Sequence, residues 1–259
     1  MLTRPGERHH IAQFYQDEDF LIEALTQFVG GGLAEGEGVV VFATSAHWEA
    51  SVCRFAAHNV SLQDAESRGQ LAFMDAGTAL SSVMVDGMPD WKRFQDIVGT
   101  VVNLTRRKYP RVRAFGEMVN LLWQRGEHAA ALRLEELWNH LIKVQDLSLC
   151  CAYRIDNLHE AGYDAALQEV CGLHSHLIPA RDYGEFEASV NRASEALVGP
   201  RIAAMLRALA SAHRPLTDMP VAQSTVLWMN EHMPVTARKV LSRARRRHRS
   251  RSPALTTRS

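Results

Sequence analysis

Two rhythms of apolar and polar positions alternate along most of the chain. Short, continuous apolar runs are typical of strands that are covered on both faces of a parallel sheet. Such runs lie at 39–44, 71–76, 112–117 and 147–155. Between them, apolar residues recur every three or four positions and predict helices at 45–58, 89–108, 126–145 and 164–171. The alternation predicts an α/β fold of three layers, in which a mostly parallel sheet lies between helices on both faces.

The two ends of the chain depart from this alternation. Asp17 can cap a helix that carries apolar residues at helical spacing, and Gly30-Gly31-Gly32 is expected to end that helix. The later part of the chain is helical only, with predicted helices at 183–198, 200–213 and 222–232. The sequence therefore predicts an α/β domain, a helical segment and a basic, disordered tail, at 8–180, 181–235 and 236–259 respectively.

Charge is distributed unevenly between these regions. The chain has 29 Lys and Arg residues and 29 Asp and Glu residues, so its formal net charge is zero. Nine of the basic residues and none of the acidic ones lie in 238–259, which leaves 20 basic and 29 acidic residues, a net charge of −9, in 1–237. An acidic body has no electrostatic reason to bind nucleic acid, so nucleic-acid binding is expected only through the tail.

Targeting signals and cysteine content narrow the class of protein further. No apolar run approaches the roughly 20 residues that span a bilayer, and the first ten residues contain no apolar segment of the kind found in secretory signals. The four cysteines are few for this length, and two of them are adjacent, which fits reduced thiols better than a disulfide framework. We therefore expect a cytoplasmic protein without a membrane span.

The glycine-rich segment 30–38 is the first candidate for chemistry. A phosphate-binding loop needs glycines and a Lys-Ser/Thr pair after a strand, because backbone N–H groups and the lysine neutralise the phosphates. Here the glycines precede the strand, and Thr44-Ser45-Ala46-His47 follows it without a lysine. The chain also lacks the G-x-S-x-G and H-E-x-x-H motifs. It is therefore predicted not to be an enzyme and to need no cofactor.

Glu117 and the adjacent cysteines are candidates on the strands. Glu117 follows a strand at the edge where open α/β sheets bind their ligands, although a cap at the strand end is the alternative. Alternation along the last predicted strand places Cys150 and Cys151 on opposite faces of the sheet. Only one of these two thiols can therefore face a given pocket.

Cys171, His174 and His176 are weak candidates for the ligands of zinc or another soft metal. Thiol and imidazole groups are suitable ligands, but this spacing is not that of a zinc finger or ribbon. The alternative is that the thiol is buried and a histidine caps a helix.

Short motifs occur in a fixed order over residues 8–180. The first are His10-x4-Tyr15, an acidic helix start and a Gly36-Glu37 turn before a strand. Then come Phe115-Gly116-Glu117-Met118, Trp123, Leu134-Glu135-x2-Trp138-Asn139, Leu149-Cys150-Cys151-x-Tyr153 and the region of His174. This order resembles the MEDS family, the methanogen/methylotroph, DcmR-type sensory domain.

The resemblance implies both a fold and a function. The fold would be similar to KaiC and RecA, with a degenerate phosphate-binding loop, and the domain would sense small molecules such as hydrocarbon derivatives. The ligand-binding residues implied are His10, Tyr15, Glu117, Cys150 or Cys151, and His174. Members are often joined to histidine kinase or DNA-binding modules, and neither signature is found in this chain.

The leading hypothesis is a non-enzymatic sensory domain in signal transduction or transcriptional regulation, which holds a small molecule at the carboxyl ends of the parallel strands. Its output would pass to a signalling partner such as a histidine kinase or regulator. One alternative is a divergent ATP-binding enzyme similar to RecA and KaiC. Another is an interaction module that regulates a kinase or sigma-type factor through its helical segment.

Overall fold

The structure, a computed structural model, describes residues 2–58, 60–155, 165–179, 183–213 and 219–249. The chain divides into two compact units. The first consists of residues 1–154 and 173–176, and the second of residues 155–172 and 177–259. Among the described helices, none is both long and apolar enough to cross a membrane.

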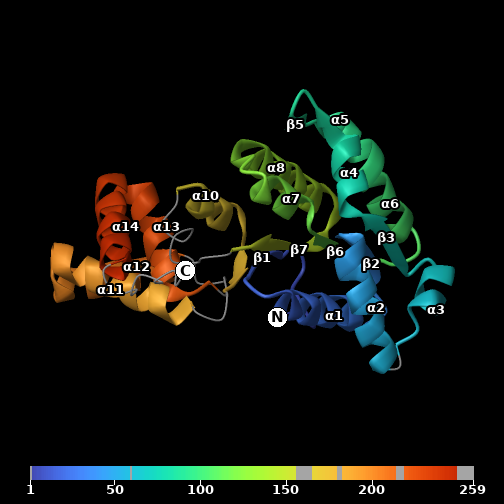
Figure 1. The fold of residues 1–259 in the computed structure, drawn as a ribbon, viewed down its shortest axis with the longest axis horizontal. Coiled ribbons are helices and arrows are strands. Elements are labelled where there is room, and N and C mark those ends of the chain that lie inside the picture. The colour runs from blue at the N-terminus through green and yellow to red at the C-terminus, as the bar shows by residue number, and fades with distance from the viewer. Residues whose placement is uncertain (1, 59, 156–164, 180–182, 214–218, 250–259) are drawn as a thin grey trace, which may run out of the picture. The chain divides into compact units, whose positions relative to one another are not determined.

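Five of the six strands of the central sheet lie in the first unit, and the sixth, β8, begins there with His176 (Figure 1). The strand order of the sheet is β3-β2-β6-β7-β1-β8. The strands are β1 (His10–Tyr15), β2 (Gly38–Ala43), β3 (Leu71–Asp75), β6 (Val112–Gly116), β7 (Leu147–Arg154) and β8 (His176–Ile178). Neighbours from β3 to β1 pair in parallel. Every residue of β2 and β6 is buried, as the continuous apolar runs predict for a sheet covered on both faces.

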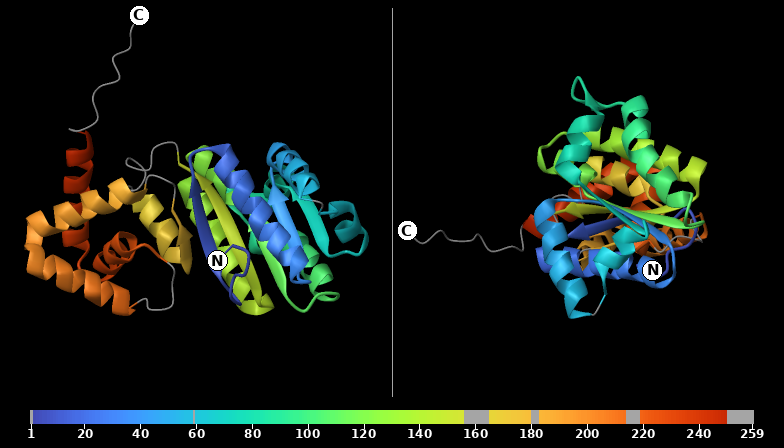
Figure 2. Two further views of the ribbon diagram at one scale, coloured as in Figure 1. Left: turned by 90° about the horizontal axis from the view of Figure 1, so that it is seen from below. Right: turned by 90° about the vertical axis from the view of Figure 1, so that its right-hand side faces the viewer.

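Helices cover both faces of this sheet, and Figure 2 shows the layers from two sides. The helices on one face are α1 (Glu18–Ala34) and α2 (Ser45–Ala57). Those on the other face are α4 (Ala76–Val83), α6 (Thr100–Arg106), α7 (Met118–Gln124) and α8 (His128–Gln145). The predicted α/β class, with helices on both faces of a parallel sheet, is confirmed.

Smaller elements join these layers. They are α3 (Leu62–Ser67), α5 (Trp91–Phe94), the π-helix η1 (Gln95–Gly99) and a hairpin of β4 (Met84–Val85) and β5 (Met88–Pro89). The helix predicted over 89–108 is therefore a succession of α5, η1 and α6. A π-helical turn inserts one residue into the helical repeat, so the apolar spacing alone could not distinguish it from a continuous α-helix.

The glycines of α1 serve packing and do not end the helix, contrary to the prediction. The helix continues through them to Ala34. A Cβ atom on Gly31 would lie 2.5 Å from the Thr3 carbonyl oxygen, and one on Gly32 would lie 2.8 Å from the side chains of Arg113 and Val39. The absence of Cβ atoms lets the N-terminal segment and β2 approach the helix closely.

The first strand of the sheet, β1, is absent from the predicted elements. Its sequence, HIAQFY, mixes polar and apolar residues, yet all six residues are buried. β1 lies inside the sheet next to β7, with His10 opposite Leu149 and Ala12 opposite Cys151. The polar residues His10 and Gln13 hid the strand, because a buried strand is recognised by its apolar run.

The second unit is helical. Its helices are α10 (Ala165–Leu173), α11 (Tyr183–Val198), α12 (Pro200–His213), α13 (Val221–His232) and α14 (Pro234–Arg249). Helix α14 packs against α11 and α13 through Ala237, Val240, Leu241 and Ala244. The helical segment therefore extends to Arg249, although the tail was expected to begin at residue 236. The apolar residues recur at helical spacing among the arginines, and the rest of the predicted tail, 250–259, lies outside the described residues.

Candidate functional site

Polar side chains gather where three strands of the first unit end, the adjacent strands β2 and β6 and the strand β1, which β7 separates from β6. Tyr15 is the last residue of β1, Thr44 follows β2, and Glu117 follows β6. Because these strands are parallel, their carboxyl ends lie at the same edge of the sheet. We call this group, with His47 and Asn120, the strand-end group.

Glu117 is the centre of the strand-end group. Its side chain is fully buried, and its Oε2 accepts a hydrogen bond of 2.7 Å from the backbone N–H of Thr44. Its Oε1 lies 2.8 Å from Nδ1 of His47, which donates because a carboxylate can only accept. The His47 side chain is 16% exposed. The group therefore connects a buried charge to the surface through one imidazole ring.

The hydrogen bond to Glu117 raises the pKa of His47 above its ordinary value, and this outweighs the opposing effect of burial. The charge of Glu117 adds to the rise in the pKa of His47. The folded structure therefore favours the protonated imidazole. An imidazole beside a buried carboxylate can donate, accept or exchange a proton with a ligand at this edge.

Tyr15 and Asn120 form the inner part of the strand-end group. Asn120 Nδ2 donates to the hydroxyl of Tyr15 at 3.0 Å, and Asn120 Oδ1 accepts from the backbone N–H of Arg154 at 2.8 Å. Burial raises the pKa of Tyr15, and the nearby charge of Glu117 raises it further. Tyr15 is therefore a neutral hydrogen-bonding group.

The position of Glu117 in the topology is favourable for a ligand. Helix α2 leaves β2 towards one face of the sheet, and helix α7 leaves the adjacent strand β6 towards the other face (Figure 1). In open α/β sheets, the crevice for ligands lies at the carboxyl ends of two such strands. Thr44, His47 and Glu117 lie at this place, the topological switch point of the sheet, where helices leave adjacent strands for opposite faces.

A second polar group lies inside the first unit. His10 begins β1, Glu135 lies on α8, Cys151 lies on β7, and His174 follows α10. All four side chains are buried, and one possible ligand atom from each lies within 4.8 Å of the others. We call these four residues the buried quartet.

The contacts of the quartet centre on Glu135. Its Oε2 lies 3.1 Å from His10 Nε2 and 3.5 Å from Cys151 Sγ, and its Oε1 lies 3.4 Å from His174 Nε2. The hydroxyl of Tyr153 donates to the same carboxylate. Burial acts to raise the pKa of Glu135, but the neighbouring His174 and His10 reverse this and lower it. Glu135 is therefore a buried carboxylate.

The structure divides the predicted ligand-binding residues between these two groups. His10, Cys151 and His174 belong to the buried quartet, whereas Tyr15 and Glu117 belong to the strand-end group. His10 and Tyr15 stand at opposite ends of β1, about 16 Å apart at 3.3 Å per residue. The structure does not gather these residues into a single group.

The other predicted residues lie outside both groups. Cys150 occupies the position before Cys151 on β7, so its side chain points to the opposite face of the sheet, as predicted. Among the proposed metal ligands, His174 alone is in the quartet. His176 stacks on His9 and contacts Ser175, and Cys171 is buried in α10 of the second unit.

Sequence reasoning missed Glu135 and His47 as members of these groups. The signal for Glu135 was an acid on the apolar side of the helix, four residues after Ala131 and three before Trp138. His47 had no comparable signal, because its role depends on the approach of Glu117 from a strand 70 residues away.

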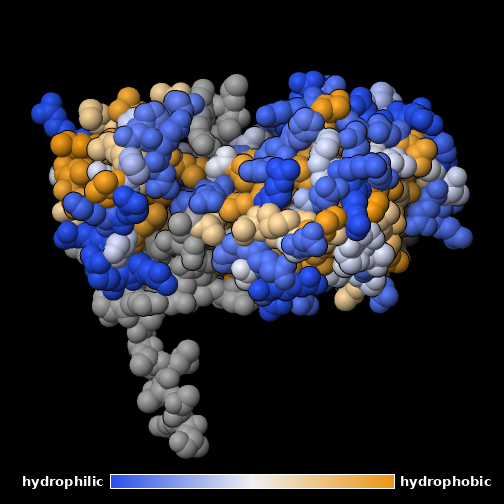
Figure 3. Space-filling view, turned by 90° about the horizontal axis from the view of Figure 1, so that it is seen from above, coloured by the Kyte–Doolittle hydropathy of each residue, from blue (hydrophilic) through white to orange (hydrophobic). Residues whose placement is uncertain are grey.

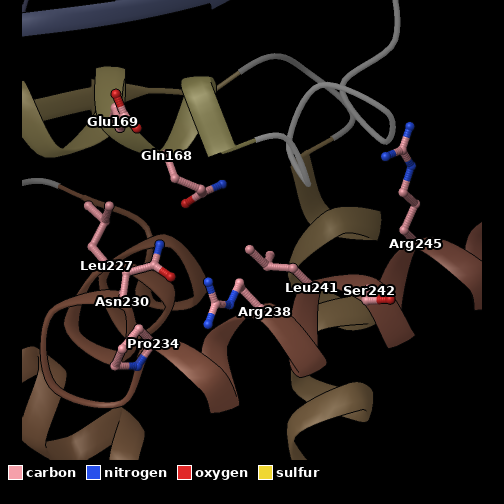
Figure 4. A pocket seen from close by; sticks show the side chains of 9 residues that line it. All are labelled: Gln168, Glu169, Leu227, Asn230, Pro234, Arg238, Leu241, Ser242 and Arg245. Atoms are coloured by element: carbon pink, nitrogen blue, oxygen red, sulfur yellow. The ribbon is translucent and has the colours of Figure 1, made fainter.

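The second unit contains a cavity of about 500 Å³. Figure 4 shows its side chains, and Gln168 of α10 and Arg238 of α14 extend into the same space. Its lining also includes Leu227, Asn230 and Leu241. This volume lies in the range of small-molecule sites, but the lining contains no group of buried titratable residues comparable with the quartet.

The comparisons with known proteins concern most of the first unit. Residues 9–175 match the model of the family described as MEDS, the methanogen/methylotroph, DcmR sensory domain. No curated protein matches the chain. The matched range contains every member of the strand-end group and of the buried quartet. The chain belongs to the MEDS family of sensory domains.

Proposed function

We propose that residues 9–175 form a non-enzymatic sensory domain that binds a small molecule at the strand-end group. The observation that carries this proposal is the pairing of buried Glu117 with partly exposed His47 at the switch point of the sheet. Membership of a family of sensory domains supports a role in signalling. The chemistry of His47 and Glu117 favours a ligand with at least one hydrogen-bonding group.

Structural coupling supports sensing at this place. Thr44 caps α2, with its hydroxyl accepting from His47 N–H, and Glu117 is the residue before α7. A ligand that takes the hydrogen bond of His47 away from Glu117 would act on the starts of both helices. These helices lie on opposite faces of the sheet, so one binding event would reach both outer layers.

The alternative is a divergent ATP-binding enzyme of the RecA and KaiC type. A phosphate bound after β2 would need free backbone N–H groups, but the N–H of Thr44 donates to Glu117. The carboxylate would also repel a phosphate at this turn. These observations favour a sensor. Calorimetry with ATP, with and without Mg²⁺, tests the alternative, and micromolar binding would support the enzyme.

Native mass spectrometry of the freshly purified full chain tests the sensory proposal. We expect a small molecule on the wild type that is lost in Glu117→Gln. Glu136→Gln is the matched control, because Glu136 is exposed on α8 and pairs with Arg133 at the surface. Where no molecule co-purifies, short alcohols and amines are screened by thermal shift on the same three proteins. A ligand that binds Glu117→Gln as well as the wild type would refute this site.

The proposed output is a protein contact of the helical unit. Helix α12 exposes Ile202, Met205 and Leu209, which lie on one face at helical spacing. Figure 3 shows apolar surface between hydrophilic stretches of the molecule. Such a face suits a signalling partner, a histidine kinase or a regulator. Replacing the three residues with serine is expected to preserve small-molecule binding and to abolish signalling in the native host.

Nucleic acid is the other partner that the charges allow. Arg238, Lys239 and Arg243 lie on α14, and no acid follows them in the chain. Binding by counterion release would weaken steeply with salt. A salt titration of binding to duplex DNA checks this proposal.

A further inference from the structure

We propose that the buried quartet, His10, Glu135, Cys151 and His174, is a binding site for a divalent transition-metal ion of the Zn²⁺ class. The quartet shares no residue with the strand-end group, so a test of this metal site does not depend on the sensory proposal.

The spacing of the four ligand atoms is the first argument. Ligand atoms at 2.0–2.3 Å from one ion in a tetrahedron are about 3.3–3.8 Å apart. Glu135 Oε2 lies 3.1 Å from Nε2 of His10 and 3.5 Å from the sulfur of Cys151, and the other carboxylate oxygen, Oε1, lies 3.4 Å from Nε2 of His174. One ligand atom from each of the four residues lies within 4.8 Å of the others. The sulfur is also 3.5 Å from His10 Nε2. These separations suit a tetrahedral site after small movements.

The assignment of hydrogen-bond donors and acceptors around His10 is the second argument. Asn139 Nδ2 donates to the Leu173 carbonyl at 2.9 Å, so Asn139 Oδ1 is the atom that faces His10 Nδ1, at 3.0 Å. A neutral imidazole has one N–H, and Asn139 uses it. In this neutral form, Nε2 presents a lone pair to the Glu135 carboxylate. A metal ion between these atoms turns two opposed lone pairs into two ligands.

This arrangement of His10 is also that of metal-binding histidines in general. Such a histidine donates its second ring N–H to an oxygen acceptor, which fixes the ring and the tautomer. Asn139 supplies that acceptor from α8, one turn after Glu135. Tyr153 likewise orients the carboxylate of Glu135. The ligands therefore have supporting partners of their own.

Charge balance is the third argument. When the ion binds, the sulfur–hydrogen bond of Cys151 breaks, a sulfur–metal bond forms, and the proton leaves to solvent. The thiolate and the carboxylate of Glu135 then neutralise the two positive charges of the ion. A neutral assembly is the form that a site buried to this degree can accommodate.

The kinds of ligand atom select the kind of metal. Two imidazoles, one thiolate and one carboxylate suit Zn²⁺ and its neighbours, whereas Mg²⁺ and Ca²⁺ prefer oxygen ligands throughout. With four protein ligands the tetrahedron is complete, as in structural zinc sites. The ion would join β1, α8, β7 and the segment after α10.

Metal analysis of the full-length protein tests the proposal. The purified chain is stripped with a chelator, loaded with Zn²⁺, and measured by mass spectrometry of metals; loading with Co²⁺ gives the absorption spectrum. We expect one equivalent of Zn²⁺, and with Co²⁺ the intense visible bands of a tetrahedral site and a thiolate charge-transfer band. Cys151→Ser should lose the charge-transfer band. Cys150→Ser, which changes the adjacent buried thiol on the opposite face, should keep it.

Asn139→Ala gives a second test that leaves all four ligands in place. Loss of such a supporting partner is expected to weaken Zn²⁺ binding about 10- to 100-fold, measured by competition with a chromophoric chelator. Circular dichroism confirms that each variant is folded. The proposal is overturned if the wild type binds less than about one tenth of an equivalent under these loading conditions. It is also overturned if Cys151→Ser and Asn139→Ala bind Zn²⁺ as tightly as the wild type.

Discussion

Replacing Glu117 with glutamine removes one charge from the strand-end group and keeps the size of the side chain. The wild-type carboxylate accepts two hydrogen bonds, from Thr44 at 2.7 Å and from His47 at 2.8 Å. A hydrogen bond to a charged group contributes about 1.5–3 kcal/mol to stability, and a neutral one about 0.5–1.5 kcal/mol. Glutamine has one acceptor oxygen, so it can keep only one of the two bonds, as a neutral bond weaker by about 1 kcal/mol, and it loses the other, which contributes about 2 kcal/mol. Glu117→Gln should therefore lower the free energy of unfolding by about 3 kcal/mol while His47 is protonated.

The cost of Glu117→Gln should depend on pH. Because the folded pKa of His47 is raised, its pairing with Glu117 stabilises the fold fully below the unfolded pKa of about 6.5 and is lost as pH rises through the folded pKa. At about pH 9 the bond from Thr44 remains, and the cost should fall to about 1 kcal/mol. The double variant His47→Gln/Glu117→Gln should show no such dependence relative to His47→Gln.

Urea unfolding followed by tryptophan fluorescence measures this effect, because four of the five tryptophans, Trp48, Trp91, Trp123 and Trp138, lie in the first unit. With a slope of about 2 kcal/mol per molar urea, the midpoint should fall by about 1.5 M at about pH 6. The control Glu136→Gln should change it by less than about 0.5 M. Equal losses at both pH values, or a loss no larger than that of the control, would refute the reasoning.

Three further predictions concern packing. Glu37→Gln removes the carboxylate from Arg113, whose side chain is 1% exposed, and should lower the free energy of unfolding by about 3–5 kcal/mol. Arg111→Ala removes the exposed partner of the same carboxylate and should lower it by about 0–1 kcal/mol. Equal urea midpoints for the two variants would contradict this prediction. Gly32→Ala forces a Cβ against Arg113 and should cost about 1–3 kcal/mol, whereas an unchanged midpoint would show that the contact yields freely. Val240→Ala removes the equivalent of two buried methylene groups from α14 and should cost about 1.5 kcal/mol in thermal unfolding of the helical unit, where a disordered segment would show no effect.

The sequence predicted the elements whose pattern is local. β2 and α2 follow directly from a continuous apolar run and from helical spacing after the cap Thr44. β1 was not predicted because His10 and Gln13 interrupt its apolar run. The strand is buried by the rest of the fold, and Asn139 on α8 supplies a hydrogen-bond partner for His10. The glycines of α1 were misinterpreted for the same reason, since the close contacts come from distant parts of the chain, from Thr3 at Gly31 and from Arg113 on β6 at Gly32.

The sequence indicated several residues of the candidate sites, but not which of them lie together. The motif order indicated His10, Cys151 and His174, but it could not show that they meet at Glu135. That meeting depends on the register of β1 against β7, where Ala12 lies opposite Cys151. A shift of one residue would turn Cys151 to the other face of the sheet. Register is set by the whole sheet, so a single sequence does not reveal it.

Access to solvent decides what each polar group of the first unit can do. The His10 and Glu135 side chains are 3% and 0% exposed, so a molecule that must enter and leave during signalling would have to open the sheet or α8. His47, 16% exposed beside fully buried Glu117, can meet a ligand without such an opening. A site that must respond to changing concentrations needs exchange, whereas a site that holds the fold together benefits from its absence. This difference supports both proposals, sensing at the strand-end group and a stabilising ion in the buried quartet.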